Sequence, residues 1–74
     1  MSHHDVWEVT DLEVAVLRAL PLYRRDVALL PHVAEQEGVS QQKVRLALES
    51  LHRHGAVLRW DGESARTERG RRAA

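Results

Sequence analysis

Cysteine and phenylalanine are absent from this chain, and only two prolines and four glycines occur among its 74 residues. Without cysteine the chain can form no disulfide, no thiolate metal site and no thiol nucleophile, so packing alone must stabilise the fold. No apolar run approaches the roughly 18 residues from which a membrane-spanning helix is predicted. The acidic N-terminal segment has no apolar stretch typical of a signal peptide, and we therefore expect a cytoplasmic protein.

The short length of the chain limits the function as well. It suffices for one small domain with one hydrophobic core, and an enzyme with a deep pocket is not expected. No glycine-rich phosphate loop is present, and no acid–base pair has a spacing that forces proximity. His52 and His54 would diverge by about 200° on a helix, and His32 has no cysteine or carboxylate placed to join them. We expect no catalytic residue, no metal and no cofactor.

A net charge is also missing, because eleven basic residues balance eleven acidic ones. The distribution along the chain is uneven, however. Residues 1–38 hold three arginines against seven acidic residues, a balance of −4, whereas residues 39–74 hold eight basic and four acidic residues, a balance of +4. The basic half begins beside the clearest helical pattern of the sequence, and it is a candidate surface for an acidic partner.

A first helix is predicted over residues 11–20. Thr10 and Glu13 have the spacing of a capping box, in which each side chain accepts a hydrogen bond from the other residue's backbone N–H. Apolar residues then recur at helical spacing until Pro21 ends the pattern. Trp7 lies in the short preceding tail, and we expect its indole to fold onto the core.

The segment "PLYRRDVALLPHVAEQEG" allows two interpretations. Proline is favoured at the first position of a helix, so the preferred prediction is a helix from Pro31 to about Glu37, ended by Gly38. "VALL" is then a short extended piece ahead of that helix. The alternative is one kinked helix from Asp26 to Glu37.

A further helix is predicted over residues 40–54, in the stretch "GVSQQKVRLALESLHRHG". Ser40 is a suitable N-cap, and Gly55 follows as a C-terminal stop. At about 100° per residue, one face of this helix is apolar; its residues are Val44, Ala47, Leu48 and Leu51. The opposite face carries Gln42, Leu46, Glu49 and Arg53.

A β-hairpin is predicted next, because "AVLRW" and "ESART" flank Asp61-Gly62, which favours a two-residue type I′ turn. This turn places Leu58 opposite Ala65, and Arg59 opposite Ser64 and diagonal to Arg66. The hairpin thus has an apolar side and an arginine side. We expect Trp60 to cover the edge of the core, and residues beyond Gly70 to fray or form a short helical turn.

The order of these elements resembles the winged helix-turn-helix superfamily. The stretches that carry the resemblance are "TDLEVAVLRAL", "VAEQEGVSQQKVRLALESLHRHGAV" and "RTERGR", the last similar to the "LTEKGR" signature that closes the wing in regulators of the MarR and PadR type. The resemblance implies an α+β domain of three helices and a two-stranded wing over residues 10–71. Residues 1–9 are then a tail, and residues 72–74 a frayed end.

The same resemblance implies a regulator of transcription that binds double-stranded DNA. The helix over about 40–54 would enter the major groove, and the wing over about 56–67 would contact the backbone or minor groove. Residues matching the start of the recognition helix are Ser40, Gln41, Gln42, Lys43 and Arg45, and those matching the wing are Arg59 and Arg66. MarR and PadR proteins dimerise through additional helices, which we do not expect within these 74 residues.

Side-chain chemistry divides these candidates. Glutamine suits adenine and arginine suits guanine, so Gln42 and Arg45 are the candidates for reading bases. A phosphate needs only a positive charge nearby, and the candidates for that contact are Lys43, Arg53, Arg59 and Arg66.

Two residues of the outward helix face favour a different function. Glu49 would repel phosphate unless it accepts a hydrogen bond from a cytosine, and Leu46 could contact either a thymine methyl group or a protein. The alternative to DNA binding is therefore a winged-helix module that binds a protein through Leu46. A homodimer is also expected to be possible through the first helix, where Val14 and Leu17 widen the apolar stripe.

Overall fold

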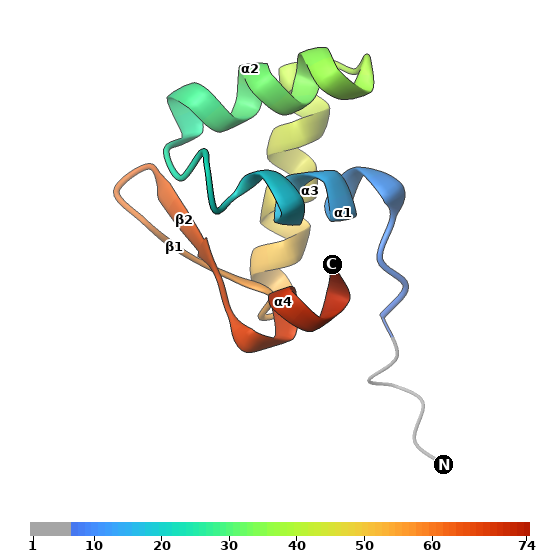
Figure 1. Ribbon diagram of the computed structural model, residues 1–74, viewed down its shortest axis with the longest axis vertical. Coiled ribbons are helices and arrows are strands. Elements are labelled where there is room, and N and C mark those ends of the chain that lie inside the picture. The colour runs from blue at the N-terminus through green and yellow to red at the C-terminus, as the bar shows by residue number, and fades with distance from the viewer. Residues whose placement is uncertain (1–6) are drawn as a thin grey trace.

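Four helices and a two-stranded antiparallel sheet make up residues 7–74, the part of the chain that the computed structural model describes (Figure 1). The elements are α1 (Asp11–Ala19), α2 (Asp26–Glu37), α3 (Gln41–Arg53), β1 (Val57–Trp60), β2 (Glu63–Arg66) and α4 (Glu68–Ala73). In Figure 1, α2 crosses the top of the domain, α1 lies in front of α3, and α4 lies below them. The predicted α+β class is confirmed, and the order of elements is consistent with a winged-helix layout.

The start of α1 is the predicted capping box. The Thr10 hydroxyl accepts a hydrogen bond from the Glu13 N–H at 3.1 Å, and the Glu13 carboxylate accepts one from the Thr10 N–H at 2.9 Å. The helix ends at Ala19 with Leu20 as its cap, directly before Pro21. Local sequence therefore determines both ends of this helix.

A single helix, α2, runs through Pro31, so the preferred prediction of an extended piece followed by a helix from Pro31 is wrong and the alternative is right. Burial provides the physical reason, because the apolar residues of this segment cover the core only when the whole segment is helical; they are Leu29, Leu30, Val33 and Ala34. Proline has no N–H for the carbonyl of Val27, but Val27 is exposed to solvent.

The extended backbone lies just before α2, not within it. Arg24 accepts a hydrogen bond from the Ser64 N–H at 2.9 Å, and Gly62 accepts one from the Asp26 N–H at 2.8 Å. Arg25 forms an isolated antiparallel bridge with Glu63 between these two bonds. The connection between α1 and α2 is thereby attached to the edge of β2.

Helices α2 and α3 are joined by a tight turn. Gly38 adopts the left-handed conformation, with φ of 69°, which glycine reaches without steric cost. The hydroxyl of Ser40 then accepts a hydrogen bond from the Lys43 N–H at 3.1 Å, as expected of an N-cap. The helix predicted over residues 40–54 is confirmed, and its predicted apolar face is buried in the core.

The hairpin has the predicted turn and the predicted register. Asp61 and Gly62 both have positive φ, of 46° and 73°, as a type I′ turn requires. Leu58 pairs with Ala65 and Arg59 with Ser64.

The arginine side of the hairpin, with Val57 and Ser64, faces the core. The expectation that Trp60 covers the edge of the core is therefore wrong. Val57 and Ser64 are buried, whereas Leu58 and Trp60 are 59% and 43% exposed. Because alternate residues of a strand share a face, burial of Val57 turns both Leu58 and Trp60 toward solvent. The apolar side of the hairpin is therefore its outer side.

The stretch "RTERGR" contains the end of β2, the N-cap Thr67 and the start of a fourth helix, α4. Thr67 donates its hydroxyl hydrogen to the carbonyl of Gly55 at 2.6 Å and accepts a hydrogen bond from the Gly70 N–H at 3.2 Å. Gly70 is buried against Ala56 and the side chain of Leu17. The helix continues to Ala73, which packs on the core, so of the two alternatives for the residues beyond Gly70, fraying or a short helical turn, the structure has the helical one.

The N-terminal part of the domain also packs inward. Trp7 is half-buried and stacks on His54 with ring centroids 4.6 Å apart, as predicted for a tail that folds onto the core. Leu17 is fully buried within the domain, and Val14 is half-buried. Within the domain α1 contacts α2, α3 and α4, and a homodimer through this helix stays a prediction.

Candidate nucleic-acid interface

The outward face of α3 carries most of the residues predicted to contact DNA. Each predicted residue of this segment is exposed to solvent; the six are Ser40, Gln41, Gln42, Lys43, Arg45 and Arg53. At 100° per residue, Gln42, Leu46 and Arg53 form the row opposite the buried face, with Arg45 and Lys43 on its two sides. The structure therefore brings this part of the predicted site together on one surface.

The charge of this surface is positive. Three ion pairs lie within residues 7–74, namely Arg25–Glu63, Arg59–Asp26 and Arg72–Glu68, and none of them involves a basic residue of α3. Glu49 is the single acidic residue of the helix. The positive end of the helix dipole, at the first turn, adds to the attraction for an anion.

Leu46 occupies the middle of the outward face, where it is 52% exposed. It makes no part of the core, because the buried residues of α3 lie on the other side of the helix. A half-exposed leucine at this position can contact an apolar group of a partner, either a thymine methyl group or an apolar side chain.

Arg59 has a different partner from the predicted phosphate. Its guanidinium donates two hydrogen bonds to the carboxylate of Asp26, at 2.8 and 3.1 Å, and a third to the hydroxyl of Ser64 at 2.7 Å. The side chains of Arg59 and Asp26 are only 22% and 16% exposed. We call these three residues the Arg59 clamp.

The surroundings of Arg59 stabilise the charged form of its guanidinium. The hydrogen bond with Asp26 raises the pKa of Arg59, and the negative charges of Asp26 and Glu49 act in the same direction, whereas burial opposes them. The clamp joins the hairpin to the first turn of α2. Sequence alone could not indicate this role, because Asp26 and Arg59 are brought together only by the pairing of β2 with the segment before α2.

Arg66, the second predicted wing residue, belongs neither to the outward face of α3 nor to the Arg59 clamp. Its half-buried side chain lines a hollow with Arg24 and Arg71, and no residue of α3 belongs to that lining. Arg24 and Arg71 were not predicted as functional residues. They come from different elements, and no local pattern in the sequence connects them.

Other kinds of site are not evident in the described residues. Across residues 7–74, no group of three or more histidine, cysteine, aspartate or glutamate residues could hold a metal ion. None of the helices in that part of the chain has both the length and the apolar character needed to cross a membrane.

Comparison with known proteins does not assign the chain to a family. No family model, no curated protein and no solved structure matches the chain.

Proposed function

We propose that this protein binds double-stranded DNA sequence-specifically and acts as a small transcriptional regulator, with α3 in the major groove and the β1–β2 hairpin against the backbone or minor groove. The observation that carries this proposal is the exposed outward face of α3, where Lys43, Arg45 and Arg53 have no ion-pair partner within residues 7–74. A major groove about 12 Å wide admits an α-helix presented in this way. The order of helices and hairpin is consistent with a winged-helix layout, which supports the proposal.

Some of the proposed contacts recognise bases, and the others bind phosphates and position the protein on the duplex. Gln42 can donate to and accept from one adenine, and Arg45 can donate two hydrogen bonds to one guanine. Each such bidentate pair discriminates against the wrong base by about 1–3 kcal/mol. Lys43 and Arg53 are suited to phosphates, which position a protein on the duplex without specifying sequence.

In this proposal Arg59 is a positioning residue and not a phosphate contact. The Arg59 clamp holds the hairpin against α2, and it thereby supports the orientation of the wing relative to α3. Contacts of the wing with DNA then come from groups that face solvent, among them the exposed Trp60.

Selection of bound sequences from a random duplex pool tests the proposal. We expect a short enriched motif, and its symmetry will show whether one or two copies of the chain bind. The Arg45→Ala variant should lose the preference at one position of that motif, while Arg72→Ala, on α4 and paired with Glu68, should leave the motif unchanged. Recovery of no motif from the wild-type protein would refute sequence-specific binding.

The second candidate function is protein binding through α3, which is favoured by the exposure of Leu46 in the middle of the outward face. This candidate predicts no binding to duplex DNA even at low salt. It also predicts that Leu46→Asp abolishes binding to a purified partner without a change in thermal unfolding. A wild-type protein that binds duplex, with a partner affinity indifferent to Leu46→Asp, contradicts it.

A further inference from the structure

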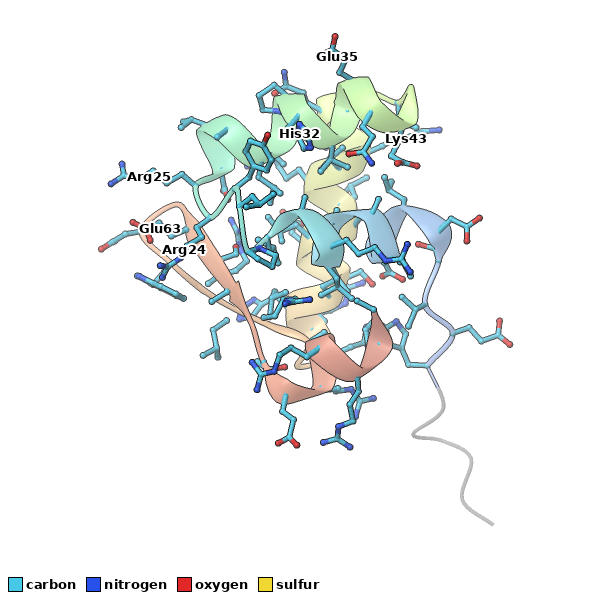
Figure 2. The ribbon with its side chains drawn as sticks, in the orientation of Figure 1. Arg24, Arg25, His32, Glu35, Lys43 and Glu63 are labelled. Atoms are coloured by element: carbon cyan, nitrogen blue, oxygen red, sulfur yellow. The ribbon has the colours of Figure 1, made fainter. Side chains whose placement is uncertain are left out.

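A hollow between α1, β2 and α4 gathers three arginines from three different parts of the fold. Arg24 precedes α2, Arg66 ends β2 and Arg71 belongs to α4. Figure 2 shows Arg24 on the hairpin side of the domain, near Arg25 and Glu63. The remaining lining of the hollow is apolar, and its volume is about 180 Å³; the apolar residues are Leu20, Pro21 and Ala65. We call this site the arginine hollow.

We propose that the arginine hollow binds a small phosphorylated molecule through its phosphate group. Ala65 and Arg66 of this lining belong to the hairpin, and none of the lining residues belongs to α3. Binding of a small phosphorylated molecule here does not require that the protein bind DNA.

The positive charge of the arginine hollow is not compensated within its lining. No acidic residue lines the hollow, and its three arginines take part in none of the ion pairs within residues 7–74. Glu63 and Glu68, the acidic residues of β2 and α4, lie outside the lining, where Glu63 is 3.9 Å from Arg25 and Glu68 is 3.6 Å from Arg72. Like charges around one hollow repel each other, and a bound anion removes that repulsion.

The charge and hydrogen-bond donors of the lining suit a phosphate group. A guanidinium presents its N–H groups in a planar fork that binds phosphate oxygens in pairs, and a phosphate monoester carries about −1.5 to −2 charges at pH 7. Three positive charges suit such a group better than they suit a singly charged carboxylate. The volume is below the roughly 300–1,000 Å³ of pockets for drug-sized ligands, so the ligand must be compact.

Backbone hydrogen bonds hold in place the segments that carry the three arginines. The carbonyl of Arg24 accepts a hydrogen bond from the Ser64 N–H at 2.9 Å, and Arg66 pairs with Val57 in the hairpin. The N–H of Arg71 donates to the Thr67 carbonyl at 2.9 Å in the first turn of α4. With the backbone fixed in this way, ligand binding has to order only the three arginine side chains.

The test is a titration of the ¹⁵N-labelled full chain with inorganic phosphate and with pyrophosphate, at an ionic strength held constant with sodium chloride, followed by ¹H–¹⁵N NMR. We expect saturable shifts of the backbone and guanidinium N–H signals of Arg24, Arg66 and Arg71. The variants Arg24→Gln and Arg71→Gln should each weaken binding roughly tenfold, as expected for loss of a hydrogen bond to a charged group.

Arg72→Gln is the matched control, because it removes the same charge from the same helix outside the hollow. Its phosphate affinity should stay within about twofold of the wild type, given that a rim charge acts only weakly. The proposal is overturned if phosphate causes no saturable shifts, if the shifts spread evenly over all arginines, or if Arg72→Gln weakens binding as much as Arg71→Gln.

Two further ligands identify the source of the phosphate. Glycerol 3-phosphate should bind with the same dependence on Arg71 as inorganic phosphate, while the duplex affinity of Arg71→Gln should equal that of Arg72→Gln. If Arg71→Gln selectively weakens only duplex binding and glycerol 3-phosphate does not bind, the hollow contacts the DNA backbone and the proposal is wrong. Absence of duplex binding by the wild-type protein would leave the phosphate titration unaffected, so the two proposals can fail separately.

Discussion

Arg59 and Asp26 connect the hairpin to α2 through two parallel hydrogen bonds, and Ser64 receives a third from the same guanidinium. Both charged side chains are mostly buried, so their pairing is screened less than that of a surface ion pair. Removal of one partner leaves the other charge partly buried without compensation. Arg59 thus helps to hold the hairpin against α2.

Replacement of Arg59 by alanine should destabilise the domain by about 1–3 kcal/mol, because Asp26 and the buried Ser64 lose their hydrogen-bond donor. Arg59→Lys should recover only part of this loss, since an ammonium group cannot form the paired bonds of a guanidinium. Urea unfolding measures both effects. A midpoint for Arg59→Ala equal to that of the exposed control Arg72→Ala would contradict the role of the clamp.

Gly70→Ala should destabilise the domain by about 1–3 kcal/mol, although alanine normally favours a helix over glycine by about 1 kcal/mol. A β-carbon at this position would clash with the backbone carbonyl of Ala56 and press on Leu17. Either α4 or the connection between α3 and β1 must then move. Thermal unfolding of Gly70→Ala and of the wild type shows whether the substitution lowers stability. An unchanged or higher melting temperature would refute the close packing of α4.

Residue roles differed in how far the sequence could predict them. Exposure of Gln42, Lys43 and Arg45 follows from helical periodicity, because the buried positions of α3 fix which positions face solvent. The role of Arg59 was not predictable, because its partner Asp26 becomes a neighbour only through the pairing of β2 with Arg25. Long-range pairing of this kind has no signature in a local pattern.

Among the elements, α2 is the one in which local preference and tertiary packing disagree. Pro31 favours a helix start, yet the helix begins at Asp26 because Leu29 and Leu30 must both reach the core. The first turn is held by hydrogen bonds from the Asp26 N–H to the Gly62 carbonyl and from the Leu29 N–H to the Arg25 carbonyl. Tertiary contacts therefore override the preference of the proline.

Pro31→Ala should stabilise the protein by about 1 kcal/mol. Alanine restores the N–H that can bond to the carbonyl of Val27, and this gain exceeds the conformational entropy that the unfolded chain recovers when proline is lost. Pro21→Ala, a proline outside the helices, provides the comparison and should not stabilise. Chemical denaturation that gives Pro31→Ala a lower stability than the wild type would contradict the account of α2.

Elements with strictly local determinants were predicted correctly. The capping box of Thr10 and Glu13 and the positive φ angles of Asp61 and Gly62 involve residues adjacent or nearly adjacent in sequence. The extent of α4 was not predicted, because it depends on Gly70 packing against Ala56 and Leu17. Which side of the hairpin faces the core was likewise decided by packing.

At the scale of the whole molecule, a net charge of zero conceals two basic surfaces. One is the outward face of α3, and the other is the arginine hollow between α1, β2 and α4. The uneven distribution of charge along the chain indicated the first surface, since the basic half begins at α3. It could not indicate the second, because Arg24 belongs to the acidic half of the sequence.

The salt dependence of binding to a random-sequence duplex tests the proposed function most directly. Each phosphate neutralised contributes about −0.9 to the slope of log affinity against log salt, so the few cations of α3 predict a slope of roughly −2 to −3. The double variant Lys43→Ala with Arg53→Ala should flatten this slope by roughly 2, while Arg72→Ala should leave it unchanged. A wild-type protein that does not bind at low salt, or a slope equally steep in the double variant, would contradict DNA binding by α3.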